Sequence, residues 1–232
     1  MDLSIVIRSL GPNVSLVGLD GSEETDVEIF AEEERLLRAT TSPLRAAEFR
    51  LGRRAAHLAL KKIGFEPQPI LRGPQREPLW PAGVAGSITH AGDHSIAAVA
   101  RLSAAGGIGI DLENKKRWFP GLEREIAVED ELIALGQMER RAREDATIEI
   151  FSAKESIYKA HYPRIGHFFG FDAARIEFGP DHLVGYFTQT LDPLYPVGRP
   201  MEIGRLWVDD RVLTWLVLPP DVEETDRRPI RG

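Results

Sequence analysis

The grouping of strand-like segments constrains the fold of this chain more than any other feature. Segments in which apolar and polar residues alternate, as is typical of strands, are clustered along the sequence at 3–19, 94–112 and 175–218. The stretches between these clusters have helical periodicity. Grouped strands favour an α+β architecture over a doubly wound sheet, in which strands alternate with helices. The midpoint of the pattern falls near 104–107, so we expect an N-terminal half at 1–105 and a C-terminal half at 106–220. The charged, apolar-poor tail at 221–232 is expected to be disordered.

Turn and cap residues predict where these elements begin and end. Ser42 and Pro43 predict a helix start, with Ser42 as N-cap, and Gly64 predicts its end. Gly11-Pro12-Asn13 divides 3–19 into two predicted strands, and the glycine-containing turn at 103–106 predicts a hairpin. Five prolines at 67–81 predict an irregular connection, helices are expected at 28–38, 128–143 and 146–160, and late strands at 175–178, 183–191, 202–208 and 212–218.

The composition of this 232-residue chain excludes several classes of function. There is no cysteine, so disulfides, thiolate catalysis and cysteine-based zinc sites are excluded. The formal net charge is −7, which argues against a general nucleic-acid binder, so a phosphate-bearing ligand needs a local cluster of cations. No apolar run reaches the roughly 18 residues of a membrane span, and the N-terminus lacks signal-peptide features. We therefore expect a cytoplasmic chain with no membrane partner.

Two acidic segments could carry metal chemistry. In the strand-like run 107–112 and the residue after it, Asp111 and Glu113 point to one face, about 7 Å apart, which suits a hard divalent cation such as Mg²⁺. In the helical segment 146–160, Glu155 and Lys159 stand four residues apart and share a face. Glu155 could be a third metal ligand or a general base, and Lys154 and Lys159 could hold phosphate. Each pattern taken singly also fits an ordinary solvated strand end or surface ion pair.

Two further segments could bind phosphate. Gly86-Ser87-Ile88-Thr89-His90 combines small residues, hydroxyls and an imidazole just before a strand. Arg45 and Arg53 lie eight residues apart, so they fall roughly on one stripe of the predicted helix, and Arg72 follows that helix. Guanidinium groups suit phosphates, although a solvated basic face has the same pattern.

Read in order, these segments resemble the Sfp-type 4′-phosphopantetheinyl transferases, in particular the members similar to enterobactin synthase component D. The resemblance covers about residues 40 to 175, and it depends on the order and spacing of motifs that are weak singly. The matching strings are Arg45-Ala46-Ala47-Glu48-Phe49, Gly52-Arg53, Pro69-Ile70-Leu71-Arg72-Gly73, Glu77-Pro78-Leu79-Trp80-Pro81, Gly86 to His90, Gly109-Ile110-Asp111-Leu112-Glu113, and Phe151-Ser152-Ala153-Lys154-Glu155-Ser156-Ile157-Tyr158-Lys159-Ala160.

The resemblance implies a fold, a reaction and a set of site residues. The fold would be a pseudo-dimer of two similar α+β halves with the site between them. The reaction would move the phosphopantetheine arm of coenzyme A onto a serine of an apo acyl or peptidyl carrier protein and release 3′,5′-adenosine bisphosphate. Mg²⁺, or Mn²⁺ in its place, would be held by Asp111, Glu113 and Glu155, with Glu155 as candidate base and Lys159 stabilising the leaving group. Coenzyme A phosphates would contact Arg45, Arg53, Arg72, Thr89, His90, Lys154 and Lys159, with Asp111 beside them.

Two other functions use the same residues. A Mg²⁺-dependent hydrolase of a nucleotide pyrophosphate could employ the three carboxylates with water in place of the carrier serine. A non-catalytic coenzyme A-binding module is the other alternative. A transferase with an internal pseudo-dimer would be complete as a monomer, and the sequence does not name its carrier protein.

Overall fold

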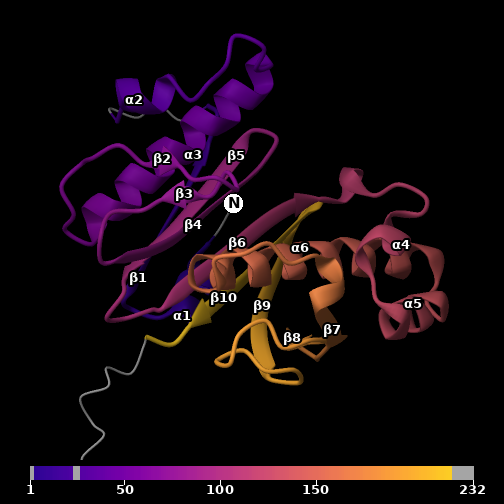
Figure 1. The fold of residues 1–232 in the computed structure, drawn as a ribbon. Coiled ribbons are helices and arrows are strands. Elements are labelled where there is room, and N and C mark those ends of the chain that lie inside the picture. The colour runs from indigo at the N-terminus through magenta and orange to yellow at the C-terminus, as the bar shows by residue number, and fades with distance from the viewer. Residues whose placement is uncertain (1–2, 23–26, 221–232) are drawn as a thin grey trace, which may run out of the picture.

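The computed structural model describes residues 3–22 and 27–220. They form two large antiparallel sheets, each packed against a long helix, and one small two-stranded sheet (Figure 1). This arrangement confirms the predicted α+β class. The predicted disorder of 221–232 falls outside the described residues.

The first sheet lies under helix α3. Its strands follow the order β1-β5-β4. The elements in chain order are α1 (Ser4–Leu10), β1 (Val14–Asp20), α2 (Ala31–Glu34), α3 (Pro43–Lys62), β2 (Leu71–Arg72), β3 (Pro78–Leu79), β4 (Val84–Ala91) and β5 (His94–Arg101).

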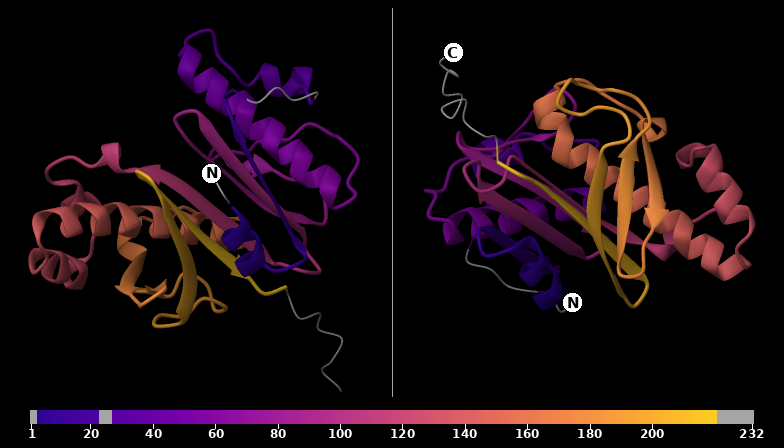
Figure 2. Two further views of the ribbon diagram at one scale, coloured as in Figure 1. Left: turned by 180° about the vertical axis from the view of Figure 1, so that it is seen from behind. Right: turned by 90° about the horizontal axis from the view of Figure 1, so that it is seen from below.

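The second sheet packs against helix α6, with α4 and α5 beside that helix (Figure 2). Its strands follow the order β6-β10-β9-β8-β7. The elements are β6 (Gly107–Asn114), η1 (Lys115–Arg117), α4 (Leu122–Ile126), α5 (Glu129–Gly136), α6 (Arg140–Ile165), η2 (Phe171–Ala173), β7 (Ala174–Phe178), β8 (His182–Phe187), β9 (Pro200–Val208) and β10 (Arg211–Leu218).

The two sheets repeat one topology. In each, the first strand is followed by a long helix, and the last strand returns to pair antiparallel with the first, β5 with β1 and β10 with β6. The sheets meet where β4 and β6 run side by side. The Oγ of Ser87 accepts a hydrogen bond from the amide of Ile110 at 3.1 Å, and the Oγ1 of Thr89 accepts one from the amide of Leu112 at 2.8 Å. A division of the chain at 105/106 remains a prediction.

Three local predictions are wrong. Residues 4–10 form helix α1 and not a strand, because its buried side chains, Val6 and Leu10, stand four apart on one helix face. The turn at 103–106 is a crossover between sheets and not a hairpin, since β5 pairs with β4 and β1 whereas β6 pairs with β10. The same kinds of residue, glycine among them, form the turn of a hairpin and a short connection between two sheets, so the local sequence does not distinguish the two. Only Ala31–Glu34 of the predicted helix at 28–38 is an α-helix.

Other boundaries are confirmed. The Oγ of Ser42 accepts the amide hydrogen of Arg45 at 3.3 Å, Pro43 opens α3, and Gly64 adopts a positive φ of 74° just after it. The late strands form β7 to β10 near their predicted positions. The break between the two predicted helices falls earlier than expected, because α5 ends at Gly136 and α6 begins at Arg140.

Glycines on β6 allow α6 to pack directly on the sheet. A Cβ atom at Gly109 would lie 1.8 Å from the carbonyl oxygen of Ser156, and one at Gly107 would lie 2.3 Å from that of Ala160. The hydroxyl of Ser152 adds a hydrogen bond to the carbonyl of Asp111 at 3.1 Å. This close packing sets the α6 side chains beside the carboxylates of β6.

Candidate active site

A large cavity of about 1140 Å³ lies between the two halves. Side chains of α3, β4, β6 and α6, together with the 72–78 loop, line it. Every predicted site residue except Lys154 lines this cleft: Arg45, Arg53, Arg72, Thr89, His90, Asp111, Glu113, Glu155 and Lys159.

Carboxylates gather at one end of the cleft. Asp111 is buried, and its Oδ1 accepts a hydrogen bond from the Nζ of Lys159 at 2.6 Å. Its Oδ2 is buried with no hydrogen-bond partner. Burial, together with the nearby charges of Asp111 and Glu155, raises the pKa of Glu113 to about 8, against the opposing influence of Arg117 and Lys159. Burial and Asp111 also raise the pKa of Glu155.

This carboxylate end fits a divalent cation. Within residues 3–22 and 27–220 no three histidine, aspartate or glutamate side chains already form a compact metal site, and Lys159 occupies one oxygen of Asp111. The free Oδ2 is nevertheless a buried acceptor in need of a partner. Three mutually repelling carboxylates are the oxygen donors that Mg²⁺ prefers, and a cation would relieve their repulsion.

Cations gather at the other end of the cleft. The guanidinium groups of Arg53 and Arg72 both lie over the ring of Phe49, at 4.8 and 5.4 Å from its centre. Burial lowers the pKa of Arg53 to about 10, and the proximity of Arg72 adds to this effect. His90 contacts Arg45. Burial is the main cause of the lowered pKa of His90, and the positive charge of Arg45 lowers it further. Anions are the ligands that such a group of partly desolvated cations favours.

The structure also adds cations that the sequence did not single out. Arg38, Arg76, Lys116 and Arg117 line the cleft. Burial is the main cause of the lowered pKa of Arg72, and the nearby positive charges of Arg76 and Arg38 lower it further. Arg76 belongs to the predicted irregular connection, where it has a positive φ of 69°. Nothing in the local sequence distinguishes these residues from solvated arginines and lysines.

Lys154 requires a correction. It is buried away from the cleft, where its Nζ donates to Glu131 at 2.7 Å and to the carbonyl of Ile126 at 2.8 Å. The structure therefore does not bring Lys154 to the cleft with the other predicted residues; its side chain links α4 and α5 to α6.

Thr89 lines the cleft, but its hydroxyl is used within the protein. It accepts the amide hydrogen of Leu112 at 2.8 Å and donates to the Oδ1 of Asp111 at 3.4 Å. Thr89 thus helps to orient Asp111. His90, the next residue of this segment, is also paired within the protein, with Arg45 and, at 3.4 Å, with Glu48.

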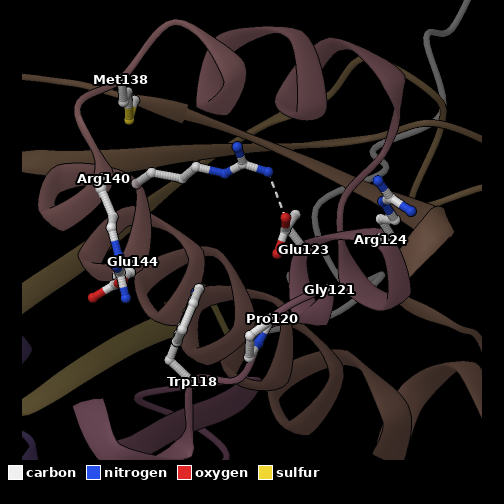
Figure 3. A pocket seen from close by; sticks show the side chains of 9 residues that line it. Trp118, Pro120, Gly121, Glu123, Arg124, Met138, Arg140 and Glu144 are labelled. Carbon is white, nitrogen blue, oxygen red and sulfur yellow. Dashed lines mark hydrogen bonds and ion pairs between the residues drawn. The ribbon is translucent and has the colours of Figure 1, made fainter.

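A second cavity of about 580 Å³ lies behind η1, between α4 and the start of α6. Figure 3 shows Trp118, Met138 and Glu123 around it. Arg143 also lines it and forms an ion pair with Glu123. It contains none of the predicted site residues.

Comparisons with known proteins show which family the chain belongs to. Residues 32–100 match the model of the 4′-phosphopantetheinyl transferase N-terminal domain, and residues 107–195 match that of the 4′-phosphopantetheinyl transferase superfamily. The chain belongs to this superfamily.

Two of the three curated relatives described next are named 4′-phosphopantetheinyl transferases. The chain is 37% identical over 167 residues to the 4′-phosphopantetheinyl transferase Svp of Streptomyces mobaraensis, covering 71% of this chain and 67% of the relative. It is 36% identical over 149 residues to PptT of Mycobacterium tuberculosis, covering 64% and 65%. It is 31% identical over 175 residues to enterobactin synthase component D of Salmonella typhi, covering 72% and 69%.

A solved structure of holo-[acyl-carrier-protein] synthase from Thermotoga maritima aligns with a TM-score of 0.40 and 18% identity, over 49% of this chain and 63% of that one. Among the described residues of the present chain, no helix has both the length and the apolar character needed to cross a membrane.

Proposed function

We propose that this chain transfers the 4′-phosphopantetheine arm of coenzyme A to a serine of an apo acyl or peptidyl carrier protein and releases 3′,5′-adenosine bisphosphate. The single observation that carries this proposal is the cleft itself. It combines a cationic end, at Arg53 and Arg72, with a carboxylate end, at Asp111 and Glu155, and Lys159 lies at the carboxylate end. This polarity suits a substrate that joins a nucleotide to a pyrophosphate, one of whose two phosphorus atoms is attacked.

The cationic end would hold the phosphates of coenzyme A. Arg45, Arg53, Arg72 and His90 come from α3, β2 and β4, so they approach a ligand from separate elements. Fixing the substrate by several charge-assisted hydrogen bonds lowers the entropic barrier to the reaction.

The carboxylate end would hold Mg²⁺ through Asp111, Glu113 and Glu155, with Mn²⁺ as a substitute. When bound, the cation neutralises pyrophosphate charge and makes the phosphorus more susceptible to attack. Asp111 would enter this site through its free Oδ2, while Lys159 keeps Oδ1. The metal identity and the three-ligand set are part of the proposal.

Two side chains would handle proton and charge. Glu155 would accept the serine proton, directly or through a water. The serine oxygen then bonds to the phosphorus as the bond to the bridging oxygen breaks. Lys159 would stabilise the negative charge that passes to the departing bisphosphate.

A direct test is to incubate the purified protein with coenzyme A, Mg²⁺ and a panel of apo carrier proteins and to measure intact carrier masses. We expect the mass of one phosphopantetheine to be gained, and this gain to be lost with EDTA and in Glu155→Ala. Glu144→Ala, on the same helix but beside the second cavity, is the matched control and should retain activity. Cleavage of coenzyme A without modification of any carrier would instead support the hydrolase. Binding of coenzyme A with neither product would support the binding module.

We further propose that the chain acts as a monomer in the cytoplasm, without a nucleic-acid or membrane partner, because one chain supplies both walls of the cleft. Sedimentation velocity with and without coenzyme A tests the oligomeric state, and cell fractionation tests the location.

A further inference from the structure

In each half of the molecule, a buried glutamate lies in the first turn of a short helix and bonds to the amide that precedes the helix. Glu33 is the third residue of α2, and Glu131 is the third residue of α5. The carboxylate of Glu33 accepts the amide hydrogen of Phe30 at 2.9 Å, and that of Glu131 accepts the amide hydrogen of Val128 at 2.7 Å. In both cases the amide belongs to the residue that precedes the helix, so each glutamate forms the carboxylate half of a capping box.

The same two glutamates make the same longer-range contacts. Glu33 accepts the amide hydrogen of Ile70 at 2.9 Å, and Glu131 accepts that of Ile176 at 2.6 Å. Each also bonds to a side-chain nitrogen of the long helix in its half. Glu33 contacts the Nε2 of His57 on α3 at 2.9 Å, and Glu131 accepts a hydrogen bond from the Nζ of Lys154 on α6 at 2.7 Å. Glu33 and Glu131 therefore occupy equivalent positions in the repeated topology.

Only Glu33 is linked to the cleft. Its Oε1 lies 3.7 Å from the Nε of Arg53, whose side chain lines the cationic end. The backbone that it holds at Ile70 continues within two residues to Arg72, a second cation of the same end. By contrast, Lys154, the partner of Glu131, does not line the cleft.

Charge explains why Arg53 needs this support. Arg53 is buried beside Arg72, and the positive charges of the two side chains repel each other where water screens them little. Glu33 is fully buried and carries the compensating charge. Burial opposes its ionisation, but the hydrogen bonds from His57 and from the amides of Ile70 and Phe30 outweigh this effect and keep its pKa below the ordinary value.

We propose that Glu33 is a positioning residue for the nucleotide substrate: it holds the guanidinium of Arg53 and the strand of Arg72 where they meet the phosphates. Glu131 fulfils the same structural task in the other half without acting on ligand binding. This inference rests on the proposed function only in assigning the cationic end to an adenosine bisphosphate group.

The test compares Glu33→Gln with Glu131→Gln, which removes the same charge from the equivalent position. Isothermal titration with 3′,5′-adenosine bisphosphate gives affinity, and transfer assays separate the KM for coenzyme A from kcat. We expect Glu33→Gln to weaken bisphosphate binding and raise this KM about tenfold, with kcat within about twofold of wild type. Glu131→Gln should lower the melting temperature but leave both binding parameters within about twofold.

A double-mutant cycle adds a readout that a purely structural role would not move. If Glu33 acts through Arg53, then adding Glu33→Gln to Arg53→Ala causes little further loss of bisphosphate affinity. Full additivity, or a Glu33→Gln protein that melts earlier but binds like wild type, overturns the proposal. Should Glu33→Gln not fold, Glu33→Asp, which keeps the charge and shortens the reach, takes its place in the same cycle.

The outcomes also separate this inference from the proposed function. A wild-type protein that binds the bisphosphate through Glu33 and Arg53 but modifies no carrier retains the inference and refutes the transferase. A protein that modifies carriers and is unaffected by Glu33→Gln refutes the inference alone.

Discussion

Replacement of Gly109 by alanine should damage both the stability and the site of this protein. The added Cβ would stand 1.8 Å from the carbonyl oxygen of Ser156 and 2.9 Å from the amide nitrogen of Ala160. Both atoms belong to the backbone of α6, so a side-chain rotation cannot relieve the overlap. The helix must move off β6.

The size of the effect follows from that distance. Carbon and carbonyl oxygen rarely approach closer than about 3.3 Å, so α6 has to shift by roughly 1.5 Å. Overpacking of this kind destabilises by about 1–3 kcal/mol, and the backbone clash places Gly109→Ala at the upper end. For a chain of this size, about 3 kcal/mol corresponds to a melting temperature lowered by roughly 6–12 °C.

The same shift should impair catalysis in the protein that remains folded. It pulls Lys159 from the Oδ1 of Asp111, a contact of 2.6 Å, and separates Glu155 from the carboxylates of β6. A displacement of about 1 Å in an active site can lower the rate about 100-fold. Calorimetry and transfer assays well below the melting temperature measure the two effects separately.

Gly136→Ala is the matched control. A Cβ at Gly136, in the last turn of α5, has no neighbour within 4 Å. This variant should be as stable as wild type or slightly more stable, because alanine is favoured over glycine in helices by roughly 0.5–1 kcal/mol. The reasoning is refuted if Gly109→Ala melts within about 2 °C of wild type and retains full activity.

Three further perturbations test the site and the fold. Asp111→Asn should weaken Mg²⁺ binding in calorimetric titrations and abolish EDTA-sensitive transfer; unchanged metal affinity would contradict the assignment of its Oδ2. Lys154→Met leaves Glu131 as an uncompensated buried charge, so it should destabilise by about 3–5 kcal/mol in chemical unfolding yet leave the KM for coenzyme A unchanged in the folded fraction. A raised KM would restore Lys154 to the ligand site. Burial lowers the pKa of His161 to about 4, below the roughly 6.5 of an unfolded chain. The unfolded state therefore binds the proton first as pH falls, so stability should drop by about 3 kcal/mol from pH 6.5 to 4, and His161→Gln should flatten this dependence. Equal slopes for both proteins would show that His161 does not titrate in this way.

Residue spacing predicted which side chains share the cleft more reliably than it predicted the pairing of strands. Asp111 and Glu113 were assigned to one face by the two-residue period of a strand, and Glu155 and Lys159 to one face by the four-residue spacing of a helix, and the structure brings all four to the cleft. Pairing between distant segments has no such local period. The turn at 103–106 was therefore mistaken for a hairpin, although it connects two different sheets.

Local periodicity decides which side chains of one element share a face, because backbone geometry repeats every few residues whatever surrounds it. It cannot decide which face another element will cover. Lys154 and Glu155 are neighbours in the chain, yet the packing of α4 and α5 buries Lys154 while Glu155 meets the cleft. Glu33 and Glu131 each stand in an acidic run typical of solvent-exposed surface, yet both are buried. Only the tertiary structure could single them out, because their long-range partners, the amides of Ile70 and Ile176 and the side chains of His57 and Lys154, lie 23 to 45 residues further along the chain.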